Sequence, residues 1–508
     1  MLTSDSTAPV SGTELFIGLV AAVGTNQDLI VEEISKALKV LQFESQEIRL
    51  IHLLRSTQKT EWQKITDSPI EKRYHDNMDA GNAMREMTGR GDALSLLGIT
   101  EVLNIRNNPS LKDKNIAYIF RSLKHPDEVK TFRKIYGPSF ILISAYAPRE
   151  IRHENLARKI ADSHGYLDPN PYYTESSNLI FRDECEMDKK LGQNLRDTFP
   201  MADVFIDVGS HGFLTSSIKR FVELLFGNTF HTPTRDEYGM FHAQAAALRS
   251  SSLGRQVGAA ISNESGDIIA VGTNEVPKPG GGLYWAEDTP DHRDHTLGED
   301  PSDKMKMNVF VELVKRLKES HWLADELAKK DPQELALEAL APGSTFSLKN
   351  TQLMNIIEFG RAVHAEMAAL LDAACRGVSV KNCTLYTTTF PCHDCAKHIV
   401  AAGIKRVLYI EPYPKSLAVG LYPDSISVDK PEDNTSRVKF EPFVGLAPRR
   451  YMELFEMLDR KKGGKVIEWG GLSPQPRLPS DPNSYTLNEV RGCETIRGKM
   501  IECDLISA

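Results

Sequence analysis

Short apolar runs and amphipathic stretches alternate over the first 225 residues of the chain. Residues 14–20, 140–145 and 204–208 are apolar without polar alternation, which is typical of parallel strands buried on both faces. A helix is predicted directly after the first run, because apolar residues recur there at helical spacing, at Ile30, Ile34, Leu38 and Leu41. This alternation predicts an α/β unit with a parallel sheet.

The pattern changes near residues 228–240, where a polar stretch containing Pro and Gly predicts a boundary between two units. Residues 257–262 and 268–272 then flank a turn and predict a β-hairpin. Further predicted helices cover residues 241–252, 304–330, 362–375, 393–402 and 449–462, and further predicted strands cover residues 384–389 and 406–411. We therefore expect three parts: residues 1–230, residues 231–445 with an insertion at about 276–355, and a C-terminal extension over residues 446–508.

Composition and charge narrow the function classes. The chain has 508 residues, a net charge of −8 and an isoelectric point of about 6.0. That net charge argues against nucleic acid as the main partner, because proteins that mainly bind nucleic acid carry a strong excess of basic residues. No run approaches the roughly 20 apolar residues that a membrane-spanning helix needs, and the N-terminus lacks the pattern of a secretory signal. Because the seven cysteines suggest no disulfide framework, we expect a cytoplasmic protein.

Two short motifs in the second unit carry the candidate chemistry. His364-Ala365-Glu366 is followed, after a predicted strand, by Pro391-Cys392-His393-Asp394-Cys395. One imidazole and two thiolates are donors that suit a catalytic zinc ion, with the fourth position left to water. Cys392 and Cys395 lie three residues apart at the start of a predicted helix, so they share one face and its positive N-terminal potential. Glu366 need not bind the metal and is predicted to transfer protons.

A structural zinc ion is the alternative interpretation, and it needs a fourth protein ligand. Cys375 and Cys383 are the nearest candidates, but we predict both to be small buried residues. The order of the two motifs, H-x-E and then P-C-x-x-C, is the signature of the zinc deaminases that act on cytosine or adenine. The catalytic interpretation is therefore favoured over the structural one.

Residues 240–430 resemble the deoxycytidylate deaminase branch of the cytidine deaminase superfamily. The matching stretches are RQVGAAI (255–261), IIAVGTNEVP (268–277), HAEMAAL (364–370), TLYTTTFPCHDC (384–395) and AAGIKRVLYIEPYPKS (401–416). The resemblance implies an α/β/α sandwich with a five-stranded mixed sheet and one catalytic zinc ion per subunit. It also implies that Asn274 contacts the substrate sugar, and a turn residue that ends a strand is the alternative for Asn274.

The whole chain resembles the bacterial anti-phage dCTP deaminases, which join a nucleotide-kinase-like unit to this deaminase domain. The likeness rests on SLKHPDEVK (122–130), FILISAYAPREIR (140–152), GQNLRDTFPMADVFIDV (192–208) and EPYPKSLAVGLYPDSI (411–426). It implies conversion of dCTP and dCMP to dUTP and dUMP with release of ammonia, which drains a nucleotide pool that a phage needs. It further implies a homo-oligomer, often a hexamer, and the regulation of some relatives by a small RNA.

The loop after the first predicted strand aligns with a phosphate-binding loop of the Walker type, G-x-x-x-x-G-K-[ST]. Here it reads LVAAVGTN (19–26): Gly24 is kept, Thr25 stands in place of the lysine, and Asn26 stands in place of the magnesium-binding hydroxyl. We expect a degenerate P-loop kinase-like unit whose loop either binds a nucleotide or serves only as a scaffold. Phosphoryl transfer is not expected, because the lysine that reaches the outer phosphates is missing.

The leading interpretation is a zinc-dependent deaminase of free deoxycytidine nucleotides, a hydrolase of C–N bonds in cyclic amidines. Two alternatives stay open. One is a nucleic-acid cytosine deaminase, which needs a basic groove for a single strand or a flipped base. The other is a nucleotide or RNA sensor with a structural zinc ion.

Overall fold

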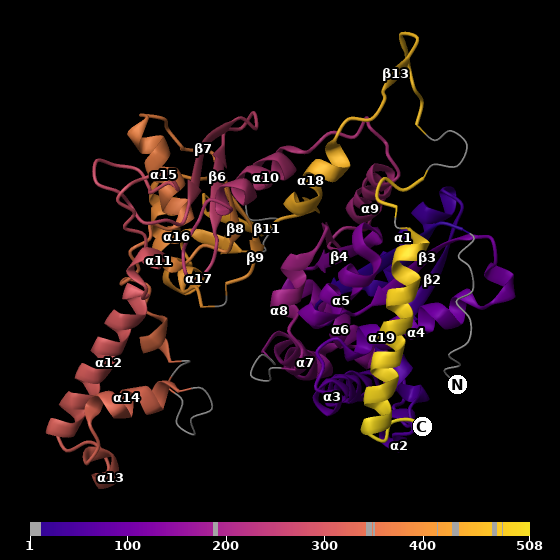
Figure 1. Ribbon diagram of the computed structural model, residues 1–508, viewed down its shortest axis with the longest axis horizontal. Coiled ribbons are helices and arrows are strands. Elements are labelled where there is room, and N and C mark those ends of the chain that lie inside the picture. Colours follow the sequence, from indigo (N-terminus) through magenta and orange to yellow (C-terminus); the bar gives the residue numbers. More distant parts are fainter. Residues whose placement is uncertain are drawn as a thin grey trace. The chain divides into compact units, whose positions relative to one another are not determined.

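The computed structural model divides the chain into two compact units (Figure 1). The first combines Met1–Glu237 with Pro442–Ala508, and the second is Tyr238–Glu441. The structure describes residues 12–185, 191–341, 348, 351–413, 415–428, 436–469, 475–479 and 481–507. The second unit is thus inserted into the first, and the predicted C-terminal extension (446–508) belongs to the first unit.

A six-stranded sheet in the order β12-β5-β4-β1-β3-β2 forms the centre of the first unit. Its strands are β1 (Glu14–Ala21), β2 (Phe43–Arg49), β3 (Asn115–Arg121), β4 (Phe140–Tyr146), β5 (Val204–Asp207) and β12 (Gly445–Leu446). The first five are parallel, and only the short β12 runs antiparallel, beside β5. The α/β class and the parallel-rich sheet predicted from the apolar runs are confirmed, and the kinase-like assignment stays a prediction.

Helices cover both faces of this sheet, because successive residues of β1 point to opposite sides. Leu15, Ile17 and Leu19 pack in a core with α1, whereas Phe16 and Val20 pack in a second core with α4 and α5. The helices of the unit are α1 (Gln27–Val40), α2 (Thr60–Gln63), α3 (Ile70–Thr88), α4 (Ala93–Arg106), α5 (Pro126–Tyr136), α6 (Arg149–Ser163), α7 (Tyr173–Cys185), α8 (Leu195–Thr198), α9 (His211–Leu225), α18 (Pro448–Phe455) and α19 (Pro482–Glu502). Short 3₁₀ turns occupy Leu50–Ser56, Pro109–Leu111, Gly137–Ser139, Asn170–Tyr172 and Phe199–Met201.

The C-terminal helix α19 completes the second of these cores through an ionic network. Arg106 of α4 makes paired hydrogen bonds to Glu14 of β1 and to Glu489 of α19, at 2.8–3.0 Å. The hydroxyls of Tyr118 and Tyr485 donate to the Glu14 carboxylate at 2.9 and 2.6 Å. All of these side chains are buried, so α19 is an integral part of the first unit.

The second unit also contains a six-stranded sheet, in the order β10-β11-β9-β8-β6-β7. Its strands are β6 (Gly258–Ser262), β7 (Ile268–Thr273), β8 (Thr384–Thr389), β9 (Arg406–Glu411), β10 (Ile426–Val428) and β11 (Val438–Pro442). The predicted count of five strands is wrong by one, because the three-residue β10 adds to the edge in parallel with β11. The predicted hairpin is formed by β6 and β7, which are antiparallel.

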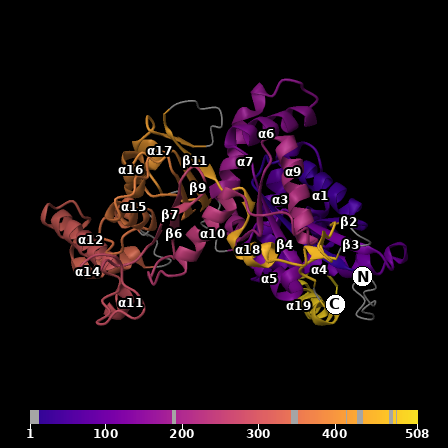
Figure 2. The ribbon, with the colours of Figure 1, turned by 90° about the horizontal axis from the view of Figure 1, so that it is seen from above.

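Helices lie on both faces of this second sheet (Figure 2). α10 (Arg235–Ala247) packs on one face, and α15 (Ala365–Cys375) and α16 (His393–Ala401) pack on the other. α15 approaches β7 closely: a side chain at Gly272 would place its Cβ 2.2 Å from the carbonyl oxygen of Ala365. This close packing of a glycine against an alanine-rich helix fixes the N-terminal end of α15.

The insertion forms a small helical subdomain within the second unit. It contains α11 (Asp294–Leu297), α12 (Pro301–Glu319), α13 (Asp325–Ala328), α14 (Pro332–Leu340) and a 3₁₀ turn at Gln352–Asn355. Outside the insertion, the second unit also contains the short helix α17 (Ala418–Leu421). The predicted helix 304–330 is wrong in extent, since α12 ends at Glu319 and His321 adopts φ 57°. The predicted helices 241–252 and 449–462 likewise end early, at Ala247 and Phe455. None of the described helices is long and apolar enough to cross a bilayer.

Paired short strands lie near the end of the chain. The residues of β13 (Lys461–Lys462) and β14 (Lys465–Val466) are antiparallel and exposed. They belong to the first unit by their position in the sequence.

Candidate metal centre and active site

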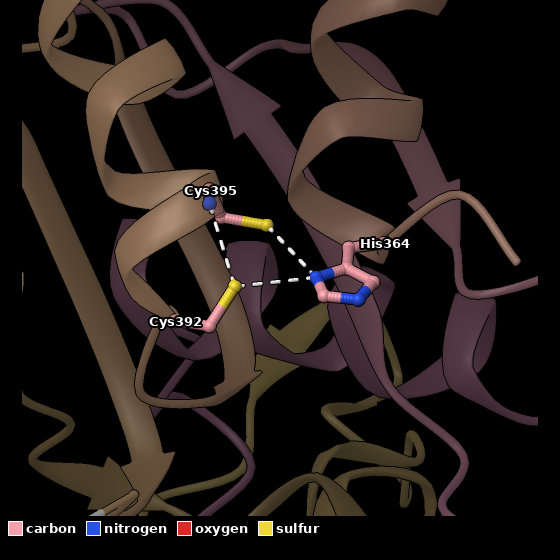
Figure 3. Close-up of side chains that lie close together, drawn as sticks. All are labelled: His364, Cys392 and Cys395. Atoms are coloured by element: carbon pink, nitrogen blue, oxygen red, sulfur yellow. Dashed lines mark hydrogen bonds between the residues drawn. The ribbon is translucent and has the colours of Figure 1, made fainter. Parts of the chain in front are cut away.

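The N-terminal ends of α15 and α16 bring the three predicted zinc ligands together (Figure 3). His364 is the N-cap of α15, Cys392 is the N-cap of α16, and Cys395 lies in the first turn of α16. The Nδ1 atom of His364 lies 3.2 Å from Cys392 Sγ and 3.4 Å from Cys395 Sγ. In a tetrahedral zinc site with ordinary bond lengths, a nitrogen and a sulfur ligand are about 3.5 Å apart. The donor atoms therefore fit a zinc ion without rearrangement of the backbone.

Hydrogen bonds and burial shift the pKa values of all three side chains in this cluster. The hydrogen bond with Cys395 lowers the pKa of the Cys392 thiol to about 4, whereas the pKa of Cys395 lies well above its usual range because of the same bond and of burial. The hydrogen bond to Cys392 raises the pKa of His364 to about 9. A bound metal ion requires both sulfurs as thiolates and a neutral imidazole, so its binding must release protons.

Glu366 lies in the first turn of α15, beside the sulfur ligands. Its side chain is almost completely buried, and its Oε2 atom accepts a hydrogen bond from Cys395 Sγ at 3.3 Å. Burial, reinforced by the neighbouring Cys392 thiolate, raises the pKa of the Glu366 carboxyl. A carboxyl group whose pKa is raised in this way holds a proton more readily, which is a property that a general acid–base needs.

A pocket of about 310 Å³ opens onto the cluster. This volume is at the lower end of the range for small-molecule sites. Its lining includes His364, Glu366 and Cys392, and the rest of the lining consists of Gly254, Arg255, Val257, Asn274, Ile357, Ala365, Thr389, Phe390 and Tyr413. The mixture of two aromatic rings, one amide and one guanidinium suits a flat, polar, charged ligand.

Asn274 lies just after β7 and lines this pocket, as the sequence predicted for a substrate-binding residue. Its side chain also has a structural role. The Oδ1 atom accepts a hydrogen bond from the Val257 N–H at 2.7 Å, and the Nδ2 group donates to the Arg255 carbonyl at 2.7 Å. Asn274 thereby fixes the segment that carries Arg255, and its contact with a sugar stays a prediction.

Sequence reasoning missed most of the pocket wall. Arg255, Phe390 and Tyr413 lie within the stretches that carry the family resemblance, before β6, directly after β8 and two residues after β9, but the sequence did not single them out as site residues. Their side chains meet only through the fold, because they come from segments on either side of the insertion.

Two further expectations can be compared with the structure. Cys383 is buried as predicted, but Cys375 is exposed at the end of α15, so its predicted burial is wrong. Among the described residues, the group that holds His364, Cys392 and Cys395 includes no fourth His, Cys, Asp or Glu ligand. A structural zinc ion with four protein ligands has no support in this part of the chain.

The predicted nucleotide-binding loop belongs to the first unit. Gly24 has φ 88°, Thr25 is buried, and Asn26 caps α1 by accepting a hydrogen bond from the Leu29 N–H at 3.4 Å. These residues take no part in the metal cluster, which lies entirely within the second unit.

Replacement of one thiol ligand provides the test of metal binding. We expect Cys392→Ser to lower bound zinc from about one ion per chain to background, because a hydroxyl is a poor zinc ligand. Metal analysis of the purified protein measures this. The matched control is Cys383→Ser, a second buried thiol in the same unit, which should retain zinc; equal zinc content in both variants would contradict the proposed ligand set.

Comparison with known proteins agrees with this geometry. Residues 233–411 match the family described as the cytidine and deoxycytidylate deaminase zinc-binding region. The deoxycytidylate deaminase of Enterobacteria phage T2 is 48% identical over 54 residues, which are 11% of this chain and 29% of the phage protein. A probable deoxycytidylate deaminase of Drosophila melanogaster is 35% identical over 103 residues, which are 19% of this chain and 50% of the fly protein.

The chain thus spans half or less of the length of these curated relatives. Among solved structures, dCMP deaminase from the cyanophage S-TIM5 is similar at 18% identity and a TM-score of 0.22, over 42% of this chain and all of that one. The family match over residues 233–411 identifies a zinc-binding region of the cytidine and deoxycytidylate deaminase type in this part of the chain.

Proposed function

We propose that the chain is a hydrolase that deaminates free deoxycytidine nucleotides, converting dCMP, dCTP or both to the uracil forms and ammonia. The observation that carries this proposal is the buried Glu366 carboxyl group beside a His-Cys-Cys donor set, in the lining of a pocket of about 310 Å³. The names of the phage and animal relatives, deoxycytidylate deaminases, support the same substrate class.

Each residue of the site has its own role in the proposed deamination. His364, Cys392 and Cys395 would hold the zinc ion, which when bound supplies Lewis acidity that activates water near neutral pH. Glu366 takes one proton from the attacking water and delivers it to the ring nitrogen; it then moves the second proton, from the hydroxyl formed at C4, to the leaving amine as the C–N bond breaks. Phe390 and Tyr413 offer apolar faces to the base, and Asn274 keeps the 255–257 segment in place beside the sugar.

A free nucleotide is favoured over a nucleic acid by charge and by size. The net charge of −8 disfavours a polyanion, whose binding depends on several basic contacts along its backbone. Of the residues that line the pocket, only Arg255 carries a permanent positive charge. One cation suits the phosphate group of a single nucleotide, whereas a strand needs a continuous basic groove.

The biological role belongs to the same proposal. Deamination of the cytosine nucleotide pool by a cytoplasmic homo-oligomer would deprive a replicating phage of a precursor. Its support is the resemblance of the sequence, over nearly the full chain, to anti-phage dCTP deaminases, and regulation by a small RNA would follow that resemblance.

A substrate panel tests the proposal. Purified full-length protein loaded with zinc is incubated separately with deoxycytidine, dCMP, dCTP and single-stranded DNA, and ammonia and uracil products are measured. We expect turnover of dCMP, dCTP or both, and none of DNA. Turnover of DNA alone would replace the proposal with a nucleic-acid deaminase, and turnover of no cytosine compound, with or without added RNA, would favour a sensor.

A further inference from the structure

A second pocket, with a volume of about 220 Å³, lies in the first unit beside the edge strand β12. Residues of β5, α9, the segment 234–237 and the segment 444–446 line it. All of these segments belong to the first unit, whereas the metal cluster and its pocket belong to the second. The proposed deaminase activity therefore gives this pocket no role.

One side of α9 forms much of the wall. Its lining residues follow the helical repeat and so share one face: Phe213, Ser216, Ser217, Arg220, Phe221 and Leu224. The core-facing positions of a helix usually carry large apolar side chains, but two serines stand here between the rings of Phe213 and Phe221. Because a serine side chain is small, α9 leaves space between these two rings.

The strand β12 does not fill this space either. Gly445 adopts φ 138°, and a Cβ atom there would lie 2.9 Å from Cγ of Glu237, so a side chain is excluded at this position. Other parts of the lining, such as Phe205 and Leu446, are buried apolar side chains. Because protein interiors are otherwise close-packed, an apolar space of this kind is suited to a small apolar molecule.

The two charged side chains of the lining neutralise each other. The Nη atoms of Arg220 donate to the two carboxylate oxygens of Glu237, each at 2.8 Å. The same two oxygens accept hydrogen bonds from the N–H groups of Thr234 and Leu446, also at 2.8 Å. The Glu237 side chain is completely buried, so a charged ligand would either break this pair or enter without a counter-charge. Both are costly, and the pocket therefore favours a neutral ligand.

The volume and the aromatic walls define the shape of that ligand. An apolar cavity of about 150 Å³ can hold a benzene ring, so a pocket of about 220 Å³ admits such a ring with a small substituent. Phe213 is 49% exposed although it lines the pocket, which places its ring at the entrance. Aromatic rings attract one another in offset or edge-to-face packing. We propose that this pocket binds a small, neutral, planar aromatic compound, which packs between Phe213 and Phe221.

Such a compound would contact both segments through which the chain leaves and re-enters the first unit. Glu237 is the last residue before the inserted second unit, and Val444 lies two residues after Pro442, where the first unit resumes. Binding would therefore stabilise both segments against α9. The inference depends on the first unit alone, so it holds or fails independently of the proposed deaminase activity.

Compounds of matched size test the ligand class. The full-length protein is titrated, with binding followed by saturation-transfer NMR, with benzamide (neutral), benzoate (anionic), benzamidine (cationic) and cyclohexanecarboxamide (neutral, with a saturated ring). We expect benzamide to bind with a dissociation constant of about 1 mM or below, about tenfold more tightly than the two charged compounds and several-fold more tightly than the saturated amide. No saturable binding of benzamide, or equally tight binding of a charged or saturated compound, would overturn the proposal.

Variants of α9 locate the binding site. Ser217→Phe adds a ring inside the pocket and should weaken benzamide binding by about tenfold or more, because the ring occupies the same space. The matched control is Lys219→Phe, which adds the same ring to the exposed side of the helix and should bind as wild type does. Equal binding by all three proteins would place benzamide elsewhere, for example in the pocket at the metal cluster, and would contradict the proposal.

Hydrogen exchange of the wild-type protein tests the same site if Ser217→Phe does not fold. With benzamide at about ten times its dissociation constant, we expect slower exchange of the amides of α9 and of residues 444–446, because a bound compound suppresses local opening. Benzoate at the same concentration is the control and should leave both segments unchanged. Unchanged exchange with benzamide, or equal protection by benzoate, would rule out the proposed site.

Discussion

Glu366→Gln is expected to abolish ammonia release from dCMP and dCTP while zinc stays bound. The amide has the size of the carboxyl group and can still form a hydrogen bond with Cys395, but it cannot take up and return a proton. General acid–base groups typically contribute about 10²- to 10⁴-fold to the rate, so kcat should fall by at least that amount. Steady-state turnover and zinc analysis of the same preparation measure both quantities.

The control for this variant is Glu264→Gln, which changes an exposed carboxylate of the same unit, 3.9 Å from Lys405. It should keep full turnover. If Glu366→Gln retained turnover within about tenfold of wild type with zinc still bound, Glu366 would not be the proton carrier.

Arg106→Met is expected to destabilise the first unit by about 3–5 kcal/mol, because it leaves the buried carboxylates of Glu14 and Glu489 without their shared cation. Burial raises the pKa of the Glu489 carboxyl, so lower pH protonates it readily and removes part of the uncompensated charge. The loss should therefore be smaller at pH 5 than at pH 8. Native-state hydrogen exchange of β1 amides measures the free energy of opening.

Arg158→Met is the matched control for Arg106→Met. Arg158 pairs with Glu154 on the exposed surface of α6, and its loss should change the free energy of opening by no more than about 0.5 kcal/mol. A second variant, Arg106→Met/Glu489→Leu, should recover part of the stability, because it removes one buried carboxylate that has lost its cation. Equal effects of Arg106→Met and Arg158→Met would show that the network does not hold α19 in place.

The elements that the sequence predicted well are those whose signal is local. The apolar runs at residues 14–20, 140–145 and 204–208 became β1, β4 and β5, because burial on both faces leaves a continuous apolar sequence. By contrast, α19 has little segregation of apolar and polar residues, and its key residue is Glu489, a carboxylate in the interior. Its place in the core depends on Arg106, almost 400 residues away in the chain, which no local pattern encodes.

The metal cluster could also be predicted, because its signal lies in two short motifs of the sequence. His364, Cys392 and Cys395 each lie at or near a helix N-terminus in a recognisable motif, so residue type and spacing sufficed. The pocket wall and the ion pair of Lys124 with Asp183 required tertiary structure, because their members are single residues of common types.

The insertion of one unit within the other fixes the order in which the chain can mature on the ribosome. Residues 238–441 are synthesised before Pro442, so the second unit can fold while the first unit still lacks β12, α18 and α19. The first unit is complete only after Leu446 of β12 has been synthesised, whose N–H group donates a hydrogen bond to the Glu237 carboxylate at 2.8 Å. A nascent chain that ends shortly after Glu441 would therefore contain the whole second unit, with the metal cluster and its pocket, but only part of the first unit.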